Sequence, residues 1–184
     1  PQDKEDYQTI FAEIDGSVAA PTAGLHFTPS LLKKIEKKGI QIVSVILHIG
    51  LGTFRPVEVE DLTKHRMDSE FFEIPDETAK VINKALQGKK NVFVVGTSTC
   101  RALESSVTAD GFSKPNFGWT DKFIFPPYDF KVTKKLITNF HQPESTLLML
   151  AAAFAEYDFI MKAYKKALKE GYRFLSYADS MLIS

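Results

Sequence analysis

The spacing of hydrophobic and polar positions changes between helical and strand periods along the chain. Thr28, Pro29 and Gly39 bracket a helix, because they supply a capping hydroxyl, a proline at the first helical position and a glycine just past the end. The apolar, β-branched run 40–47 that follows predicts a strand covered on both faces.

The same alternation continues to the end of the chain. We expect strands over 92–95, 123–125 and 136–138, and helices over 76–87, from about Ser98, over 145–154 and over 157–170. The helix 145–154 is apolar on all sides, which indicates burial. Strands that alternate with helices predict an α/β fold, here a layered, mainly parallel sheet with helices on both faces.

Composition says more about where the protein is located than about what it binds. The 184 residues are 44% hydrophobic, and their 23 basic and 23 acidic side chains cancel, so bulk charge indicates neither a nucleic acid nor a membrane. A single cysteine and a charged start predict a cytoplasmic protein, and the run 147–155 is too short to span a membrane. Both ends look cut, so we expect a fragment of a longer protein.

One glycine turn lies between a strand and a helix. Gly96 is followed by three hydroxyl residues and then Arg101. Free N–H groups at such a turn can hold an anion, with Arg101 as a second clamp. The segment has neither the Walker lysine nor the dinucleotide glycine pattern, so a plain tight turn explains it equally well.

Histidines and carboxylates supply the candidate chemistry. His26 lies in a loop of small residues, and His48 ends a strand ahead of two glycines, Thr53 and Arg55. For each histidine alone a structural role is favoured, and no pair has the spacing of a metal site. Glu70 is a candidate proton acceptor, because burial beside two phenylalanines raises a carboxylate pKa, although a solvated loop remains an alternative.

The strongest stretch is 136–150. An apolar strand delivers Asn139 and His141, Pro143 interrupts the chain, and Ser145 caps a buried helix. Open α/β sheets build pockets in this way, at the carboxyl ends of their strands. The pattern therefore favours a functional site over a loop that merely packs a histidine.

These segments together resemble one family, the S-adenosylmethionine:tRNA ribosyltransferase-isomerases of queuosine biosynthesis. The motifs that carry the resemblance occur in family order, at 19–27, 48–54, 101–105, 120–121, 136–150, 172–174 and 176–177. One departure is Asp68, where the family pattern has a histidine.

The resemblance implies a reaction and a domain context. The ribosyl part of S-adenosylmethionine is consumed and isomerised onto 7-aminomethyl-7-deazaguanine at the tRNA wobble position, giving epoxyqueuosine, adenine and methionine, with no metal. Residues 1–184 would be the C-terminal part of an α/β catalytic domain, without the family's N-terminal segment and inserted β-barrel. The chain alone is expected to be inactive, and the enzyme to be a monomer.

The resemblance also assigns roles. Glu70 or Asp121 would take a proton and balance the sulfonium charge, and His48 or His141 would lie near the departing adenine. The turn at Gly96 would hold the methionine carboxylate. The cofactor-binding candidates are His26, Thr97, Arg101, Glu104, Thr120, Asn139, Ser145 and Thr146. Candidate tRNA phosphate contacts are Lys89, Lys90, Lys131, Lys134 and Lys135, although for any single lysine a solvated helix or loop face is favoured.

Two other functions compete with this interpretation. A tRNA- or nucleotide-binding α/β module would keep the fold without the chemistry. An S-adenosylmethionine methyltransferase is disfavoured, because the glycine turn comes late in the chain and no acidic residue follows the second strand.

Overall fold

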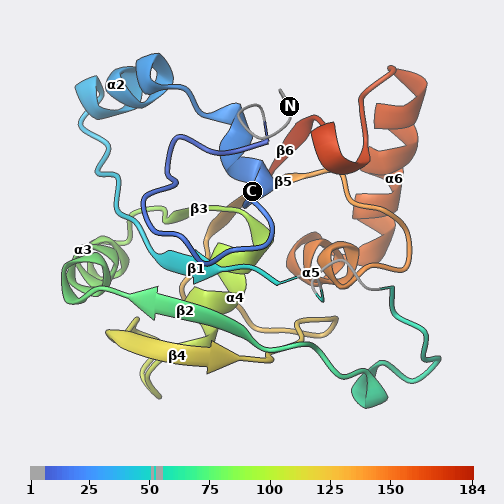
Figure 1. Cartoon of the computed structure of the whole chain (residues 1–184), viewed down its shortest axis with the longest axis horizontal. Helices are drawn as coiled ribbons and strands as arrows, with labels where there is room; N and C mark the ends of the chain where they lie inside the picture. The colour runs from blue at the N-terminus through green and yellow to red at the C-terminus, as the bar shows by residue number, and fades with distance from the viewer. Residues whose placement is uncertain (1–6, 51, 53–55) are drawn as a thin grey trace.

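A computed structural model describes residues 7–50, 52 and 56–184, without the side chain of Ser176, as two small sheets and five α-helices (Figure 1). The helices are α2 (Pro29–Lys37), α3 (Asp76–Gln87), α4 (Thr97–Ser105), α5 (Thr146–Ala155) and α6 (Tyr157–Lys169). The strands are β1 (Ile46–His48), β2 (Glu70–Ile74), β3 (Phe93–Val95), β4 (Asn116–Thr120), β5 (Lys135–Asn139) and β6 (Ser180–Ile183). Short 3-10 helices are η1 (Thr22–His26), η3 (Leu62–Lys64) and η4 (Leu175–Tyr177). The predicted α/β class is confirmed.

The first sheet has the order β1-β2-β4 and is antiparallel throughout. Glu70, the first residue of β2, lies opposite Thr120, the last residue of β4, and Phe71 lies opposite His48 of β1. Every second residue of β2, starting with Glu70, is buried. One face of this sheet therefore packs inward, and the other face carries Phe71.

The second sheet has the order β3-β5-β6, and its β3–β5 pair is the one parallel pair in the described residues. The prediction of one mainly parallel sheet is wrong there, because the β1–β2, β2–β4 and β5–β6 pairs are antiparallel. The alternation of strands and helices suggested crossovers within a single sheet. Instead, α3 leads from β2 in one sheet to β3 in the other, and such a connection imposes no parallel pairing.

Helix α4 joins the two sheets. It contacts β2 and β4 of the first sheet and β3 and β5 of the second, and α5 packs against it (Figure 1). Cys100 and Leu103 of α4 are buried in the same apolar core as Val94 and Leu136. The start of α4 is thereby fixed beside the carboxyl ends of β3 and β5, where polar residues follow the strands.

The expected helix ends are confirmed. The Thr28 hydroxyl accepts a hydrogen bond from the backbone N–H of Leu31 at 3.2 Å, and Gly39 has a φ of 75°, so it supplies the left-handed residue after α2. The Ser145 hydroxyl caps α5 in the same way, through the N–H of Leu148 at 3.1 Å. Helix α5 is largely buried, whereas α2 buries none of its residues.

Two strand predictions are wrong. The run 40–47 contributes only its last residues to β1, and Ile40 is 51% exposed, because β1 pairs with β2 alone among the described strands. Residues 123–125 form no strand: Ile124 is buried in the core, and Phe123 packs against His65. In both places an apolar run satisfied the strand pattern, but no strand among the described residues pairs with 40–45 or with 123–125.

Candidate functional site

Two hollows adjoin each other where the sheets meet α4, and Ile49 and Ser98 line both of them. The first, which we call the strand-end hollow, encloses about 390 Å³, including space open to solvent. Its walls are residues 20–23, the turn 96–99, and Thr138, Asn139, His141 and Leu147. Three segments that were singled out in the sequence therefore meet at one place.

The turn before α4 has the geometry of an anion site. Gly96 has a φ of 92°, a conformation that side chains rarely adopt, and α4 has no side-chain cap. The N–H groups in the first turn of a helix have no acceptor within the helix and carry partial positive charge. Thr97 is buried beside them, and both residues line the strand-end hollow.

His26 forms a hydrogen bond with Asn139, which lines the strand-end hollow. The His26 Nε2 lies 2.9 Å from the Asn139 Oδ1, and this amide oxygen only accepts, so the imidazole donates. The contact ties η1 to the end of β5 across 113 residues of sequence. Asn139 is 3% exposed, so this hydrogen bond fixes its amide at the wall of the hollow.

His141 is held as a neutral imidazole. Its Nε2 lies 2.7 Å from the Thr138 hydroxyl, and its backbone N–H donates to the Tyr164 hydroxyl at 2.9 Å. Burial lowers the pKa of His141 to about 4. At neutral pH this side chain offers one N–H donor and one acceptor, and it carries no charge.

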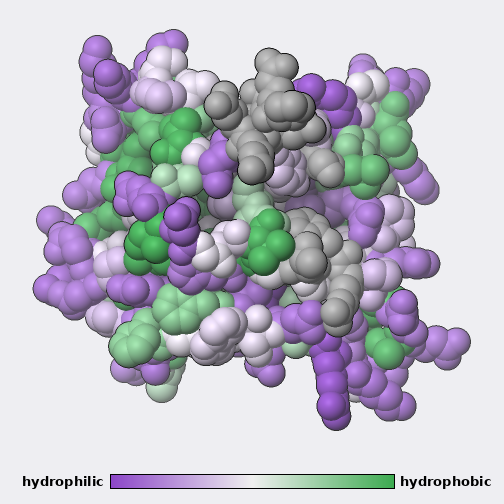
Figure 2. All heavy atoms as spheres, in the orientation of Figure 1, coloured by the Kyte–Doolittle hydropathy of each residue, from purple (hydrophilic) through white to green (hydrophobic). Residues whose placement is uncertain are grey.

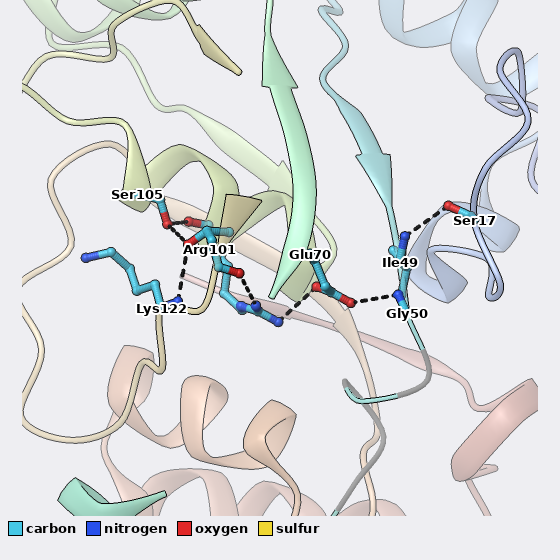
Figure 3. A network of polar contacts seen from close by, with 8 residues as sticks. Ser17, Ile49, Gly50, Glu70, Arg101, Ser105 and Lys122 are labelled. Carbon is cyan, nitrogen blue, oxygen red and sulfur yellow. Dashed lines mark hydrogen bonds and ion pairs between the residues drawn. The ribbon is translucent and has the colours of Figure 1, made fainter. Parts of the chain in front are cut away.

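The second hollow, which we call the ion-pair hollow, is centred on a buried Glu70–Arg101 pair (Figure 3). The Arg101 guanidinium donates to the Glu70 carboxylate at 3.0 Å and to the Thr120 carbonyl at 3.4 Å. The other Glu70 oxygen accepts the N–H of Gly50 at 3.2 Å. The pair thus holds β1, β2, β4 and α4 together at the ends of the strands.

The opposite charges of Glu70 and Arg101 are buried and offset each other. The Glu70 and Arg101 side chains are only 7% and 4% exposed. Burial lowers the pKa of Arg101, while the charges of Glu70 and Asp121 act in the opposite direction. The Arg101 Nε is buried without a hydrogen-bond partner in the described part of the chain. The expected burial of Glu70 is confirmed, but a guanidinium compensates its charge.

His48 and Asp121 lie at the edge of the ion-pair hollow. The His48 ring packs on Phe71 with centroids 5.3 Å apart, and its Nδ1 is buried with no partner among the described residues. Gly16 faces this ring so closely that a Cβ there would lie 2.5 Å from the Nδ1. Asp121 is exposed and directly follows Thr120 of β4. Thr53 and Arg55, expected beside His48, lie outside the described residues.

The structure does not bring Glu104 or Ser145 to either hollow. The Glu104 carboxylate accepts the backbone N–H groups of residues 131–133 at 2.9–3.0 Å and so anchors that loop. The Ser145 hydroxyl caps α5 and donates to the Gln142 carbonyl. Both side chains are buried by these contacts, which are structural. Thr146 is also buried, at the first position of α5.

The candidate phosphate-binding lysines lie away from the hollows. Lys89 and Lys90 precede β3, and Lys134 and Lys135 lie at the start of β5, which runs parallel to β3. The hollows adjoin the opposite ends of these strands. Lys131 pairs with Asp129 on the surface.

Sequence reasoning missed two residues that shape the site. The Ser17 hydroxyl donates to the Leu47 carbonyl and accepts the N–H of Ile49, so it ties the segment before η1 to β1 (Figure 3). Tyr164 reaches His141 from α6. Neither residue has a local signal, since a serine in a loop and a tyrosine on an amphipathic helix both fit the surrounding pattern.

The described residues contain neither a cluster of metal ligands nor a membrane-spanning helix. No group of three or more His, Cys, Asp or Glu side chains in residues 7–50, 52 and 56–184 is placed to hold a metal ion. In the same residues, no helix is long and apolar enough to cross a bilayer.

The sequence matches the model of the family described as queuosine biosynthesis protein over residues 1–183. Two similar relatives are named S-adenosylmethionine:tRNA ribosyltransferase-isomerase. That of Chloroherpeton thalassium is 62% identical over 99% of this chain and 53% of its own length, and that of Cytophaga hutchinsonii is 61% identical over 98% and 52%. A crystal structure of S-adenosylmethionine tRNA ribosyltransferase from Thermotoga maritima matches with a TM-score of 0.72 and 42% identity, over 89% of this chain and 51% of that one. The chain thus spans about half the length of these relatives.

Proposed function

The chain belongs to the queuosine biosynthesis protein family, and from that premise we propose that it carries the reaction site of an S-adenosylmethionine:tRNA ribosyltransferase-isomerase. The proposed reaction transfers and isomerises the ribosyl group of S-adenosylmethionine onto 7-aminomethyl-7-deazaguanine at the tRNA wobble position. Epoxyqueuosine, adenine and methionine are its products, and the cytoplasm is its proposed location. One observation carries the proposal: segments 20–23, 96–99 and 138–141, far apart in sequence, line one hollow.

The proposed activity belongs to the longer protein. The relatives named for this reaction are about twice as long as the chain. We therefore propose that residues 1–184 form the C-terminal part of the α/β catalytic domain, and that an N-terminal segment and an inserted β-barrel domain complete the enzyme. On this basis the chain alone has little or no activity, and the experiments on activity below use the full-length protein.

The turn at Gly96 is the proposed binding site of the methionine carboxylate. It combines uncapped N–H groups of α4 with the buried Thr97 hydroxyl, and both face the strand-end hollow. Arg101 lies one turn further along α4 and belongs to the adjoining ion-pair hollow. The two hollows share Ile49 and Ser98, so one extended cofactor can reach from one to the other.

Glu70 is the proposed proton acceptor and counter-charge, with Asp121 as the alternative. The sulfonium of S-adenosylmethionine acidifies the neighbouring ribose CH₂, so a carboxylate beside it serves both purposes. Glu70 lines the ion-pair hollow, where one carboxylate oxygen accepts the Gly50 N–H and the other accepts the Arg101 guanidinium. Asp121 follows β4 at the rim, within electrostatic range of Arg101.

His141 is the proposed contact of the departing adenine. As a neutral imidazole at the wall of the strand-end hollow, it can hydrogen-bond a purine nitrogen without repelling the sulfonium. His48, which lines the adjoining ion-pair hollow, is the alternative contact of the adenine. His26 and Asn139 supply further polar groups from η1 and β5.

The reaction can be tested by its products. The full-length protein is incubated with S-adenosylmethionine and a tRNA that carries 7-aminomethyl-7-deazaguanine, and free adenine and modified tRNA are measured. The proposal predicts one adenine released for each epoxyqueuosine formed. Methylated tRNA without adenine would indicate a methyltransferase, and binding of both substrates without turnover would indicate a non-catalytic module; either result rejects the proposal.

A further inference from the structure

A row of aromatic side chains crosses the outer face of the first sheet. His48 of β1 lies opposite Phe71 of β2, and Phe71 lies opposite Trp119 of β4. The His48 and Phe71 ring centroids are 5.3 Å apart, and the Phe71 and Trp119 centroids are 5.9 Å apart at 74°. We refer to these three residues as the aromatic row. It continues across three strands as cross-strand ring contacts.

The aromatic row is covered by protein at its β1 end and exposed to solvent at its β4 end. At the β1 end, Gly16 packs against the His48 ring. At the β4 end, Trp119 is 71% exposed, and Phe117 on the same face is 75% exposed. Figure 2 shows pale green and white side chains over β4, between hydrophilic groups. A large exposed tryptophan on a sheet face leaves apolar area in water that a partner can cover.

The aromatic row leads into the candidate site. His48 and Phe71 line the ion-pair hollow together with Glu70 and Arg101. The row and the hollow therefore share a border, and a chain-like ligand lying along the row reaches the edge of the hollow. Most other exposed aromatic residues, such as Phe159 on α6, have no such connection, since they line neither hollow.

Charged side chains of both signs gather at the same end of the sheet. Lys122 comes two residues after β4, and Lys64 and Arg66 precede β2, whose first residue is paired with the last of β4. The contact between His65 and Phe123, 4.9 Å between centroids, holds these two segments together. The acidic neighbours are Asp61, which pairs with Lys64, Asp68 and Asp121 at this end, and Glu73, which lies opposite Phe117 in the next row.

We propose that the aromatic row is a stacking platform for an unpaired segment of the RNA substrate, with a base on Trp119 and the adjoining nucleotide at the border of the ion-pair hollow. This inference rests on the proposed function, which supplies the RNA. Single-stranded RNA is bound by aromatic faces that stack bases beside cations that meet phosphates. Here Arg66 and Lys122 supply the cations, whereas Lys64 pairs with Asp61, and Glu73 limits the platform to the row that contains Trp119.

The test uses Trp119→Ala in the full-length protein. Stacking of one base on an aromatic ring is worth enough for Trp119→Ala to weaken tRNA binding about 5- to 100-fold. The KM for tRNA rises by a similar factor, kcat stays within about twofold, and binding of S-adenosylmethionine alone is unchanged. Trp119→Phe keeps a ring and retains most of the affinity. The matched control, Phe159→Ala, removes an equally exposed ring from α6 and leaves tRNA binding unchanged.

A second readout does not depend on the alanine variant folding. Added tRNA quenches the part of the wild-type fluorescence that Trp119→Phe removes. Wild-type affinity in a folded Trp119→Ala protein, or absence of that quenching, overturns the platform and leaves the proposed function standing if the wild type still releases adenine. Failure of the wild type to bind tRNA at all overturns the proposed function itself. A Trp119 already shielded from acrylamide before RNA is added indicates that protein covers the row, and that result also overturns the platform.

Discussion

Burial sets the protonation state of His141. The side chain is enclosed between β5 and α6, and the lowered pKa follows from the loss of hydration of its charged form. A histidine at the surface would be partly protonated near neutral pH. In the strand-end hollow the neutral ring suits a cationic cofactor, because a protonated imidazole would repel the sulfonium.

The lowered pKa of His141 predicts a pH dependence of stability. The unfolded chain takes up the proton near pH 6.5, whereas the folded chain takes it up only near pH 4. The contribution of His141 to stability is therefore complete above about pH 6.5 and is lost as the pH falls towards 4. From pH 7 to pH 5 this costs about 2 kcal/mol.

Urea unfolding, followed by the fluorescence of the single tryptophan, checks this value. His141→Gln keeps a hydrogen-bonding side chain but cannot titrate, so its stability should fall by about 2 kcal/mol less than that of the wild type between pH 7 and pH 5. Identical pH dependence in the two proteins would show that His141 is accessible to protons in the folded state.

His141 also predicts a kinetic effect. In the full-length protein, His141→Ala should lower the rate of adenine release about 100-fold or more if the imidazole assists the departing adenine. Gln142→Ala is the matched control, because the neighbouring side chain is exposed. A near-normal rate in His141→Ala would move this role to His48.

At the scale of elements, the Glu70–Arg101 pair is the main polar link between α4 and the first sheet. Arg101→Met should destabilise the protein by about 3–5 kcal/mol, because it leaves a buried carboxylate without its cation. Adding Glu70→Gln removes the unpaired buried charge of the carboxylate, so the double variant should be more stable than Arg101→Met alone. Urea unfolding of both single variants and the double variant measures this coupling. Strictly additive losses would mean that the two side chains do not interact.

The two hydroxyl-capped helices predict unequal effects. Ser145→Ala should lower the free energy of unfolding by about 1 kcal/mol or more, because α5 is buried and its cap is 1% exposed. Thr28→Ala should have a much smaller global effect, since α2 buries no residue and can fray alone. Thermal unfolding compares the two variants. An equal loss in both would show that α2 is part of the cooperative core.

Local patterns predicted the elements better than their pairing. Caps, glycines and apolar periodicity located the helices, because these signals act within a few residues. Pairing depends on partners far along the chain: the run 40–47 lacked a second neighbour, and α3 crosses between sheets. The prediction of a mainly parallel sheet was wrong for that reason.

At the scale of the whole molecule, residue types predicted which segments lie close together but not the contacts of each residue. Thr97, Asn139 and His141 line the strand-end hollow, and His26 contacts Asn139, because loops at strand ends meet at one edge of a sheet. The sequence also predicted Glu104 as a cofactor-binding residue, but its carboxylate anchors the loop at Val132 and Thr133. Only tertiary contacts show that the Glu104 carboxylate binds the backbone of a loop, whereas the Glu70 carboxylate lines a hollow.

The central claim is that segments 20–23, 96–99 and 138–141 of this chain bind S-adenosylmethionine in the full-length protein. Photolabelling with an azido-adenine analogue of the cofactor, followed by peptide mapping, tests it most directly. We predict labelled peptides from at least one wall of the strand-end hollow, with labelling abolished by excess unmodified cofactor. Competed labelling found only outside these three segments would contradict the claim.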